Sequence, residues 1–494
     1  MAKQTRTTLK SYFNTGDYPT EQNFADLIES ARNLEDDGYS LVVTVAMFPD
    51  VGDYVCDGTD DDVQIQEAID SLGSSGGTVF IKKGVYNTAS NPGVKVRNKH
   101  ITVTGEGKQL TILRGSAGHD LFNVGSDSGD TTTNLFVTVK NLTLDVETNQ
   151  GQAAFVSSGV SHVTLDNVEV RGSDNVFCVF FAGPSGGTKA GVVDGTTTDK
   201  YNAIINCDIY GNYGGDILSW SLQQYGIISN CRIDGRIAAY YGRDCVFSGN
   251  YLGTSSSNTN CPIWATAPFL NNSITGNTVT DFNGAGIRIA GGDDASDLIY
   301  GNVIVGNSID GKTTGGRGIQ IGNYSSPPHT GITKGNTITG NAIMNCVYYG
   351  IDLGYSHYNT VSGNVCRDNN SDGIHLYEST NNIINGNQCI DLRTTPGQNY
   401  GIRLTHNSDD NYVDNNILTG NTTKDIFDDS ADNTVIDRNS GRVRINRGIE
   451  IAPSSSETPT NNGDVVIEAT SDTSITFKLK GSDGTVRSGS VALT

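Results

Sequence analysis

The stretch ITGNAI, residues 338–343, decides the fold of this chain, because its pattern returns along the second half of the sequence. The pattern is an apolar residue, any residue, Gly or Asn, Asn, any residue, and an apolar residue or Cys. Successive pattern asparagines are 27, 30, 34, 23, 23 and 29 residues apart. A repeat of this length predicts a solenoid. The other copies are residues 247–252, 274–279, 304–309, 361–366, 384–389 and 413–418.

The repeat predicts an all-β solenoid, a parallel β-helix. A coil of about two dozen residues passes through three short sheets and pairs with the next coil at about 4.8 Å. Inward residues must then be apolar, or polar with a partner in the next coil. Stacked Asn amides meet this condition, so we expect an internal asparagine ladder at a turn. The ladder asparagines are Asn250, Asn277, Asn307, Asn341, Asn364, Asn387 and Asn416; earlier coils carry Cys231, Cys207, Val168 and Leu142 there.

A second strand of the form Gly-Ile-x-apolar follows each ladder position. Strand alternation points the apolar residues inward and the x residues outward. The x residues of successive coils should therefore form one column on the outer face. They are Arg288, Gln320, Asp352, His375 and Arg403, with Tyr377 and Glu378 close beyond.

This column predicts a substrate groove, since acid, base and imidazole groups alternate on it; an ordinary solvated face with charge pairs is the alternative. Hydrolysis of a glycoside requires two carboxyl groups, which Asp352 and Glu378 would supply. A lyase or epimerase acting on uronic acids requires a base, an acid and a cation near the sugar carboxylate. His375 or Tyr377 would then act as base and acid, and Arg403 or Arg288 as the cation. The sequence leaves both mechanisms open.

Aromatic residues on earlier coils predict sugar-binding platforms. Trp220 and Trp264 are expected at outward positions, with Tyr240 on the coil between them. Exposed aromatic faces suit sugar rings, whose C–H groups pack on π-faces. A subunit interface would bury the same residues, so both interpretations stay open.

Composition excludes several classes of function. The formal net charge of −21 argues against nucleic acid and against anionic membrane surfaces. No apolar run is long enough to span a bilayer, and no secretory signal is visible. The nine cysteines are scattered singly, which predicts reduced, buried thiols. We expect no cofactor and no metal; a Ca²⁺ loop is the alternative at Asp293, Asp294 and Asp297 or at Asp428, Asp429 and Asp432.

Three regions are expected along the chain. Residues 1–48 form a head, within which residues 20–34 have the spacing of an amphipathic helix. Residues 49–445 form the β-helix, whose first coil is covered by a helix over residues 63–72.

The C-terminal region, residues 446–494, alternates like a β-hairpin and turns at residues 481–484. It is too small to fold alone. Three copies in a homotrimer would bury one another, so we expect this region to serve trimerisation.

The order of motifs at the start of the solenoid carries a resemblance. DGTDDD (57–62), an amphipathic helix and GGTVFIKKGVY (76–86) resemble the start of the pectate-lyase-like superfamily of right-handed parallel β-helices. The usual Pro before the Gly is replaced here by Lys82 or Lys83. Residues 7–20 resemble the openings of phage tail proteins. The likeness is specific for fold rather than for reaction.

The superfamily includes many bacteriophage tail spikes and polysaccharide-degrading enzymes. The resemblance implies a homotrimeric tail spike or tail fibre of the virion, made in the host cytoplasm and attached to the baseplate or tail through its N-terminus. It also implies a bacterial surface polysaccharide as the partner, bound and cleaved by a hydrolase or a lyase. A purely adhesive receptor-binding fibre is the first alternative, and a free bacterial polysaccharide lyase or C5-epimerase is the second.

Overall fold

The computed structural model describes most of the chain from residue 41 onwards. The helix expected over residues 20–34 lies outside the described residues, apart from two single positions. The described residues are Thr20, Asn23, 41–73, 76–90, 92–97, 100–115, 120–125, 133–146, 153–172, 178–184, 188–211, 216–253, 261–291, 296–312, 315–322, 332–429, 434–440, 443–445, 465–471 and 474–492.

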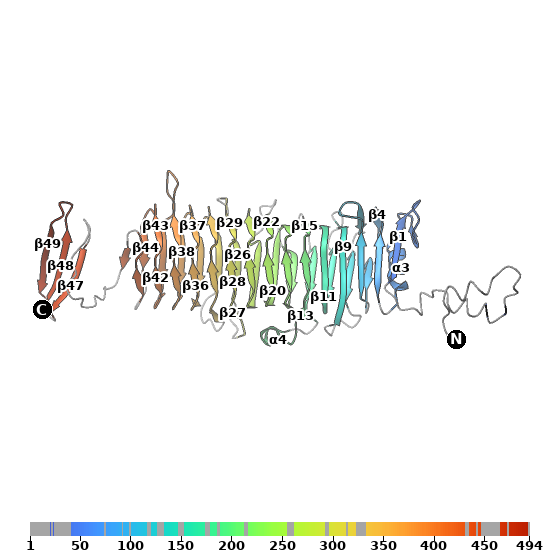
Figure 1. Ribbon diagram of the computed structural model, residues 1–494, viewed down its shortest axis with the longest axis horizontal. Helices are drawn as coiled ribbons and strands as arrows, with labels where there is room; N and C mark the ends of the chain where they lie inside the picture. Colours follow the sequence, from blue (N-terminus) through green and yellow to red (C-terminus); the bar gives the residue numbers. More distant parts are fainter. Residues whose placement is uncertain are drawn as a thin grey trace.

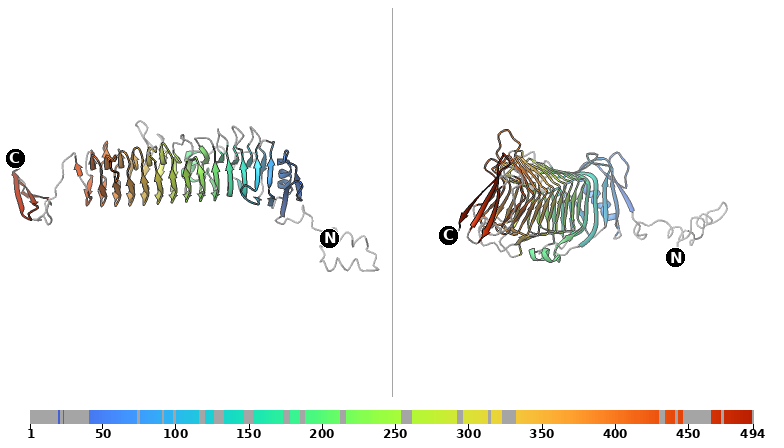
Figure 2. Two further views of the ribbon diagram at one scale, coloured as in Figure 1. Left: turned by 90° about the horizontal axis from the view of Figure 1, so that it is seen from above. Right: turned by 60° about the vertical axis from the view of Figure 1, so that its left-hand side comes forward.

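Short strands stacked in successive coils build one elongated parallel β-helix (Figures 1 and 2). Each strand pairs in parallel with the equivalent strand of the next coil, as β24 (Ser273–Thr275) does with β28 (Val303–Val305). Inward residues are Ile, Val, Leu and Phe with essentially no solvent exposure, and they form one continuous core. The parallel β-helix expected from the repeat is therefore confirmed.

Three rows of strands line the better-ordered coils, and their bounds are as follows. The first row is β18 (Ile227–Ser229), β21 (Val246–Ser248), β24, β28, β32 (Thr337–Thr339), β36 (Thr360–Ser362), β39 (Ile383–Asn385), β42 (Tyr412–Asp414) and β45 (Val435–Asp437). The second is β19 (Arg232–Asp234), β22 (Tyr251–Gly253), β25 (Thr278–Thr280), β29 (Ser308–Asp310), β33 (Ala342–Met344), β37 (Val365–Arg367), β40 (Gln388–Ile390) and β43 (Ile417–Thr419). The third is β16 (Asp216–Ser221), β20 (Arg236–Arg243), β23 (Ile263–Leu270), β26 (Ala285–Ala290), β30 (Arg317–Gly322), β34 (Ile351–Gly354), β38 (Asp372–Tyr377), β41 (Tyr400–Thr405), β44 (Lys424–Asp428) and β46 (Val443–Ile445).

The expected asparagine ladder runs inside the turn between the first and second rows. Asn341 Nδ2 donates to Asn364 Oδ1 at 2.9 Å, and the Asn341 backbone N–H donates to the same oxygen at 3.0 Å. The second Nδ2 hydrogen reaches back to the Ile304 carbonyl, at 2.9 Å. The same pattern links every ladder asparagine from Asn250 to Asn416 and extends one coil further, to Asn439. The ladder side chains thus satisfy backbone groups that the turn leaves without strand partners.

A second ladder, which the sequence analysis missed, lies five residues earlier in each coil. Asn302 Nδ2 donates to Asn336 Oδ1 at 2.9 Å, and the Asn302 N–H donates to it at 3.0 Å. The sequence contains this ladder as the pattern Asn-x-apolar-x-Gly-Asn, in which the first Asn always lies five residues before the second. The members are Asn272, Asn302, Asn336, Asn359, Asn382 and Asn411.

The residue before each ladder asparagine turns the chain in the left-handed region. Gly340 has φ +63° and Gly363 has φ +62°. Asn415 and Arg438 hold the same place with φ +54° and +42°. Glycine is favoured there because it adopts positive φ without steric cost.

The N-terminal end departs in one respect from the expected boundary at residue 49. Helix α3 (Asp62–Ser71) covers the first coil, as expected, and buries Ile65 and Ile69. However, β1 (Leu41–Met47) pairs in parallel with β3 (Gly77–Ile81). The β-helix therefore begins at residue 41, inside the segment assigned to the head.

The C-terminal residues form a small antiparallel sheet of β47 (Val465–Ser471), β48 (Ser474–Lys480) and β49 (Val486–Ala492). The turn expected at residues 481–484 joins β48 to β49. Phe477 and Leu479 are 42% and 44% exposed, so this sheet leaves apolar side chains uncovered within one chain. All nine cysteines are buried, as expected, and none forms a disulfide within the described residues.

Removal of one ladder amide should destabilise the β-helix. Asn364→Ala leaves the Asn341 N–H and the Ile338 carbonyl without their buried partners. We expect a loss on the order of 3 kcal/mol, because each buried unsatisfied group costs about 1–3 kcal/mol. Urea unfolding followed by circular dichroism measures this loss. Gln388→Ala, an exposed amide next to a ladder position, is the control and should unfold like the wild type. Equal stability of the two variants would contradict the role of the ladder.

Candidate functional site

The outward column on the third row of strands is present in the expected register. Trp264 pairs with Arg288, and Arg288 with Gln320. The column continues through Asp352, His375 and Arg403 on β34, β38 and β41. One face of the solenoid therefore presents a row of polar and aromatic side chains with a step of about 4.8 Å.

Four side chains from four coils are linked by hydrogen bonds at the centre of this face. Arg317 Nε donates to Asp352 Oδ2 at 2.7 Å, and Asp352 Oδ1 lies 2.9 Å from His375 Nδ1. His375 Nε2 lies 3.2 Å from the Thr405 hydroxyl. Asp352 has no solvent-exposed surface and His375 is 6% exposed. The link fixes the imidazole between a carboxylate and a hydroxyl.

The Thr405 hydroxyl determines how His375 is hydrogen-bonded. This hydroxyl donates to the Leu376 carbonyl at 3.1 Å, so it accepts from His375 Nε2. The other ring nitrogen faces the Asp352 carboxylate, another acceptor. The Tyr349 ring stacks on the imidazole at 4.4 Å and 25°. Burial, followed by the Asp352 and Asp372 carboxylates, raises the pKa of the Tyr349 phenol.

Asp372 joins this cluster and was missed in the sequence. It is fully buried as the first residue of β38, and its Oδ2 lies 3.6 Å from Arg403 Nη1. Within the described residues, this oxygen has no hydrogen-bond partner. Burial raises the pKa of the Asp372 carboxyl to about 6, against the opposing effects of His375 and Arg403. A titration close to neutral pH suits a proton-transfer group. The residue immediately before each Gly-Ile pair could have pointed to Asp372 in the sequence. The same position holds Arg317 and Tyr349 in earlier coils.

Tyr377 and Glu378 lie in a neighbouring cluster rather than in the His375 link. The Tyr377 ring is 4.5 Å from His406 and 5.6 Å from Tyr355. Burial and the adjacent Glu378 carboxylate raise the pKa of Tyr355. Both carboxylate oxygens of Asp352 are already hydrogen-bonded, to Arg317 and to His375. Glu378 lies on the turn after β38, with φ +45°.

The expected outward position of Trp220 is wrong. Trp220 has no exposed surface and packs in the core 5.0 Å from the Phe181 ring. A register shift between Asp216 and Leu218 changes the alternation by one residue, which exchanges the faces of the strand. Trp264 and Tyr240 do lie on the outer face, partly exposed, with ring centres 5.9 Å apart.

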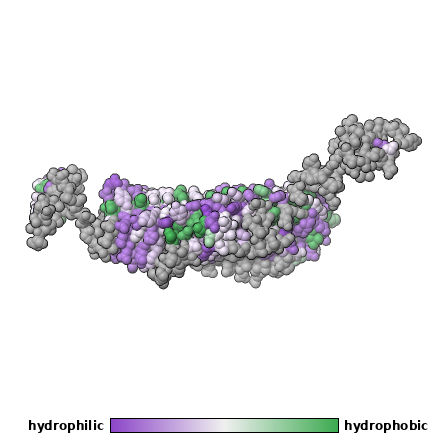
Figure 3. Space-filling model, turned by 90° about the horizontal axis from the view of Figure 1, so that it is seen from below, coloured by the Kyte–Doolittle hydropathy of each residue, from purple (hydrophilic) through white to green (hydrophobic). Residues whose placement is uncertain are grey.

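The aromatic pair and the His375 link occupy different lengths of the same face. Four coil steps separate Trp264 from His375, or about 19 Å. The face therefore offers an extended track rather than one compact pocket. Figure 3 shows that the surface on one side of the solenoid is mainly hydrophilic, with a small hydrophobic group.

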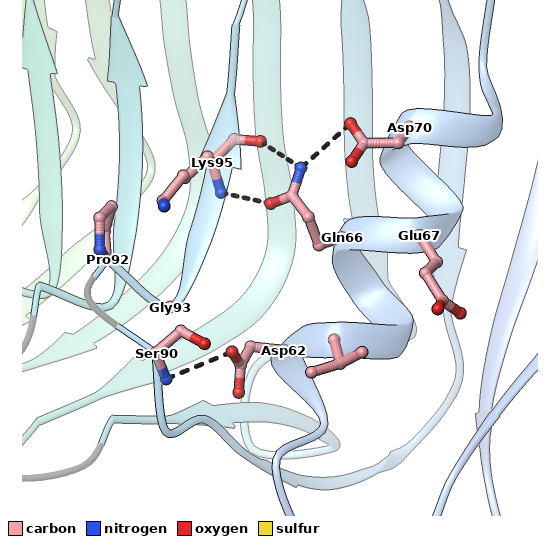
Figure 4. Close-up of a pocket in the computed structure, with 9 residues that line it drawn as sticks. Asp62, Gln66, Glu67, Asp70, Ser90, Pro92, Gly93 and Lys95 are labelled. Carbon is pink, nitrogen blue, oxygen red and sulfur yellow. Dashed lines mark hydrogen bonds between the residues drawn. The ribbon is translucent and has the colours of Figure 1, made fainter.

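A recess of about 250 Å³ lies elsewhere, between α3 and β5 (Val94–Val96) (Figure 4). Gln66 there donates to the Lys95 carbonyl at 3.1 Å and accepts from the Lys95 N–H at 2.9 Å. Asp62 accepts from Ala89 N–H at 2.8 Å. These polar groups fasten the capping helix to the first coils, which accounts for them structurally.

Metal and membrane sites are not indicated within the described residues. No group of three or more His, Cys, Asp or Glu side chains there could hold a metal ion. Of the residues considered for Ca²⁺, Asp297 pairs with Lys189, while Asp293, Asp294 and Asp432 lie outside the described residues. No described helix is long and apolar enough to cross a membrane.

Comparisons with known proteins agree with the fold. The family described as right handed beta helix region matches residues 271–479, and no curated protein sequence matches the chain. The A-module of the mannuronan C-5 epimerase AlgE6 from Azotobacter vinelandii has a TM-score of 0.50 at 18% identity, over 78% of this chain and 96% of that chain. Tailspike protein 3 of bacteriophage CBA120 has a TM-score of 0.51 at 14% identity, over 87% of this chain and 66% of that chain.

At such low identities the similarity shows the fold alone. The expected right-handed parallel β-helix fold is thereby confirmed.

The raised pKa of Asp372 should make stability depend on pH. Below about pH 4 the carboxyl is protonated in both the folded and the unfolded chain. Between about pH 4 and the folded pKa of about 6, the unfolded chain releases the proton first, so stability falls as the pH rises. Asp372→Asn removes this loss, and we expect it to gain on the order of 3 kcal/mol over the wild type above pH 6.

Urea unfolding at a series of pH values from 4 to 7 checks this expectation. Asp437→Asn, an exposed carboxylate with 57% side-chain exposure, should follow the wild-type profile. A constant difference between Asp372→Asn and the wild type across this range would contradict the raised pKa.

Proposed function

We propose that this chain is a phage tailspike that binds a bacterial surface polysaccharide along the outer face of the third row of strands and cleaves it. The hydrogen-bonded link from Arg317 through Asp352 and His375 to Thr405 carries the proposal. An ordinary solvent-exposed face of charge pairs would not need to hold an imidazole in one orientation. Arg403 and Asp372 beside it add a cation and a group that titrates near neutral pH.

Elimination at a uronic acid fits these residues best. With Nδ1 donating to Asp352, a neutral His375 that has released its Nε2 proton to solvent and left Thr405 takes the proton alpha to the sugar carboxylate on Nε2, while Arg403 neutralises that carboxylate. The C–H electron pair forms the new double bond, and the glycosidic C–O bond breaks with its electrons on oxygen. Asp372 returns a proton to that oxygen. Asp352 does not touch the substrate in this scheme; together with Arg317 it positions the imidazole.

Hydrolysis is the second candidate, and the raised pKa of Asp372 favours it. A carboxyl that stays protonated near neutral pH is the general acid that glycoside hydrolysis requires. Glu378, which remains partly exposed, would be the second carboxyl. Epimerisation at C5 would use the elimination residues without bond cleavage, and an adhesive fibre would bind without reaction.

The virion role rests on the fold shared with the CBA120 tailspike and on the C-terminal sheet. The sheet exposes Phe477, Leu479 and Val486 at 42%, 44% and 38%. We propose that these residues meet in a homotrimer, and that residues before the solenoid attach it to the phage baseplate or tail.

His375→Ala should strongly reduce cleavage while leaving binding of the polysaccharide intact. We expect turnover to fall by about 10²–10⁴-fold, the usual contribution of a positioned acid or base. Purified full-length protein is assayed on a panel of bacterial surface polysaccharides, with products identified by mass spectrometry. An ultraviolet-absorbing unsaturated uronic acid marks elimination, and its absence from cleaved products marks hydrolysis.

His357→Ala is the matched control, since His357 bonds to Thr380 on a different turn and should leave turnover unchanged. Wild-type binding without any product would make the chain an adhesin. Equal turnover of His375→Ala and the wild type would remove the proposed site.

The trimer is tested separately. Phe477→Ser combined with Leu479→Ser should lower the molar mass in solution from three chains towards one, because the uncovered apolar area would no longer be shared. Multi-angle light scattering of the full chain measures this mass. A monomeric wild type would contradict the trimer.

A further inference from the structure

Four polar side chains near the aromatic end of the outer face have no hydrogen-bond partner within the described residues. The indole Nε1 of Trp264 and the hydroxyl of Thr266 are buried and unsatisfied. The Arg288 guanidinium and the Gln320 carboxamide likewise make no hydrogen bond or ion pair there, although Gln320 is only 5% exposed. Buried polar groups are ordinarily satisfied, as they are in both ladders, so the Trp264 and Thr266 groups call for an explanation.

The four groups are neighbours on the outer face. Trp264, Arg288 and Gln320 pair in register on β23, β26 and β30, so they form three successive steps of one column. Thr266 pairs with Ala290, which pairs with Gly322, in the adjacent outward column. The large side chains of Trp264, Arg288 and Gln320 thus lie beside a column of smaller residues.

Gly322 cannot be enlarged without a clash. Its φ is +112°, and a Cβ there would lie 1.9 Å from the Gly354 carbonyl oxygen. The backbone therefore requires a glycine at this position of the column that contains Thr266 and Ala290.

The charge of Arg288 indicates what kind of ligand the cluster takes. The other two arginines of the cleavage site have carboxylates: Arg317 is 2.7 Å from Asp352, and Arg403 is 3.6 Å from Asp372. Within the described part of the chain Arg288 has no carboxylate partner, although the chain has 54 acidic and only 33 basic residues. A guanidinium left free on an acidic protein suits an anionic group, and its fork matches a carboxylate.

We infer that Trp264, Thr266, Arg288 and Gln320 form a subsite for a carboxylate-bearing sugar unit of the polysaccharide. Arg288 binds the sugar carboxylate, and Gln320 and Thr266 bond to hydroxyl groups. The sugar ring packs on the face of the Trp264 indole opposite the Arg236 guanidinium, which lies 4.3 Å from the indole ring centroid. This inference rests on the proposed function and names its substrate class as an acidic polysaccharide. Arg288 lies three coil steps from His375, about 14 Å, so the subsite holds a unit distant from the bond that is cut.

The test compares each polysaccharide of the panel in its native form and after chemical reduction of its carboxylates to alcohols. Binding of full-length protein is measured by isothermal titration calorimetry. We expect the wild type to bind the native acidic polymer at least tenfold more tightly than the reduced one. Arg288→Ala should lose at least tenfold on the native polymer and nothing further on the reduced polymer. Arg288→Lys, which keeps the charge but not the fork, should fall between them.

Arg232→Ala is the matched control, because Arg232 lies between the Tyr210 and Tyr251 rings on the second row of strands. It should bind like the wild type, and unchanged circular dichroism would show that each variant is folded. Equal binding of native and reduced polymers by the wild type overturns the inference while leaving the proposed function intact. Sensitivity to Arg288→Ala without sensitivity to reduction also overturns it, since the guanidinium would then serve another anion. Failure to bind any polysaccharide of the panel overturns both.

Discussion

The hydrogen bond between an asparagine side chain and the turn of the next coil is the interaction on which this structure depends. A β-helix must change direction several times per coil, and each turn leaves backbone N–H and C=O groups inside the wall. Asn341 shows the solution: its oxygen accepts from Asn307, and its amide donates both to Asn364 and to the Ile304 carbonyl. The turn's backbone groups are thus satisfied by side-chain amides.

The ladders also explain where function can reside. Because they fix the inner side of two turns, coil length can vary elsewhere, and successive ladder asparagines are separated by 23 to 34 residues. The outward positions of the third row lie outside both ladders. Side chains such as Arg288 and His375 can therefore be chosen for chemistry while the coil beneath them stays unchanged.

The sequence predicted features that depend on a strict period and missed those where the period breaks. The ladder frame and the column from Arg288 to Arg403 were predictable, because alternation and coil pairing hold through the strands. Trp220 was misplaced because the register shift after Asp216 exchanges the faces of its strand. Asp372 was overlooked because it is the first residue of its strand, before the Gly-Ile pair from which the alternation was read. The second ladder was overlooked although each of its asparagines lies five residues before an asparagine of the first ladder, as Asn336 does before Asn341.

The two ladders have a direction that the apolar core lacks. In every link the amide nitrogen donates towards the C-terminal coil and the carbonyl oxygen faces the N-terminal coil, as from Asn277 to Asn307 and from Asn382 to Asn411. Their dipoles therefore add head to tail along the axis, and neighbouring links polarise one another. The coils from Asn250 to Asn439 therefore carry a row of aligned side-chain dipoles, with the positive ends of the amides directed at the coils that lead to the C-terminal sheet.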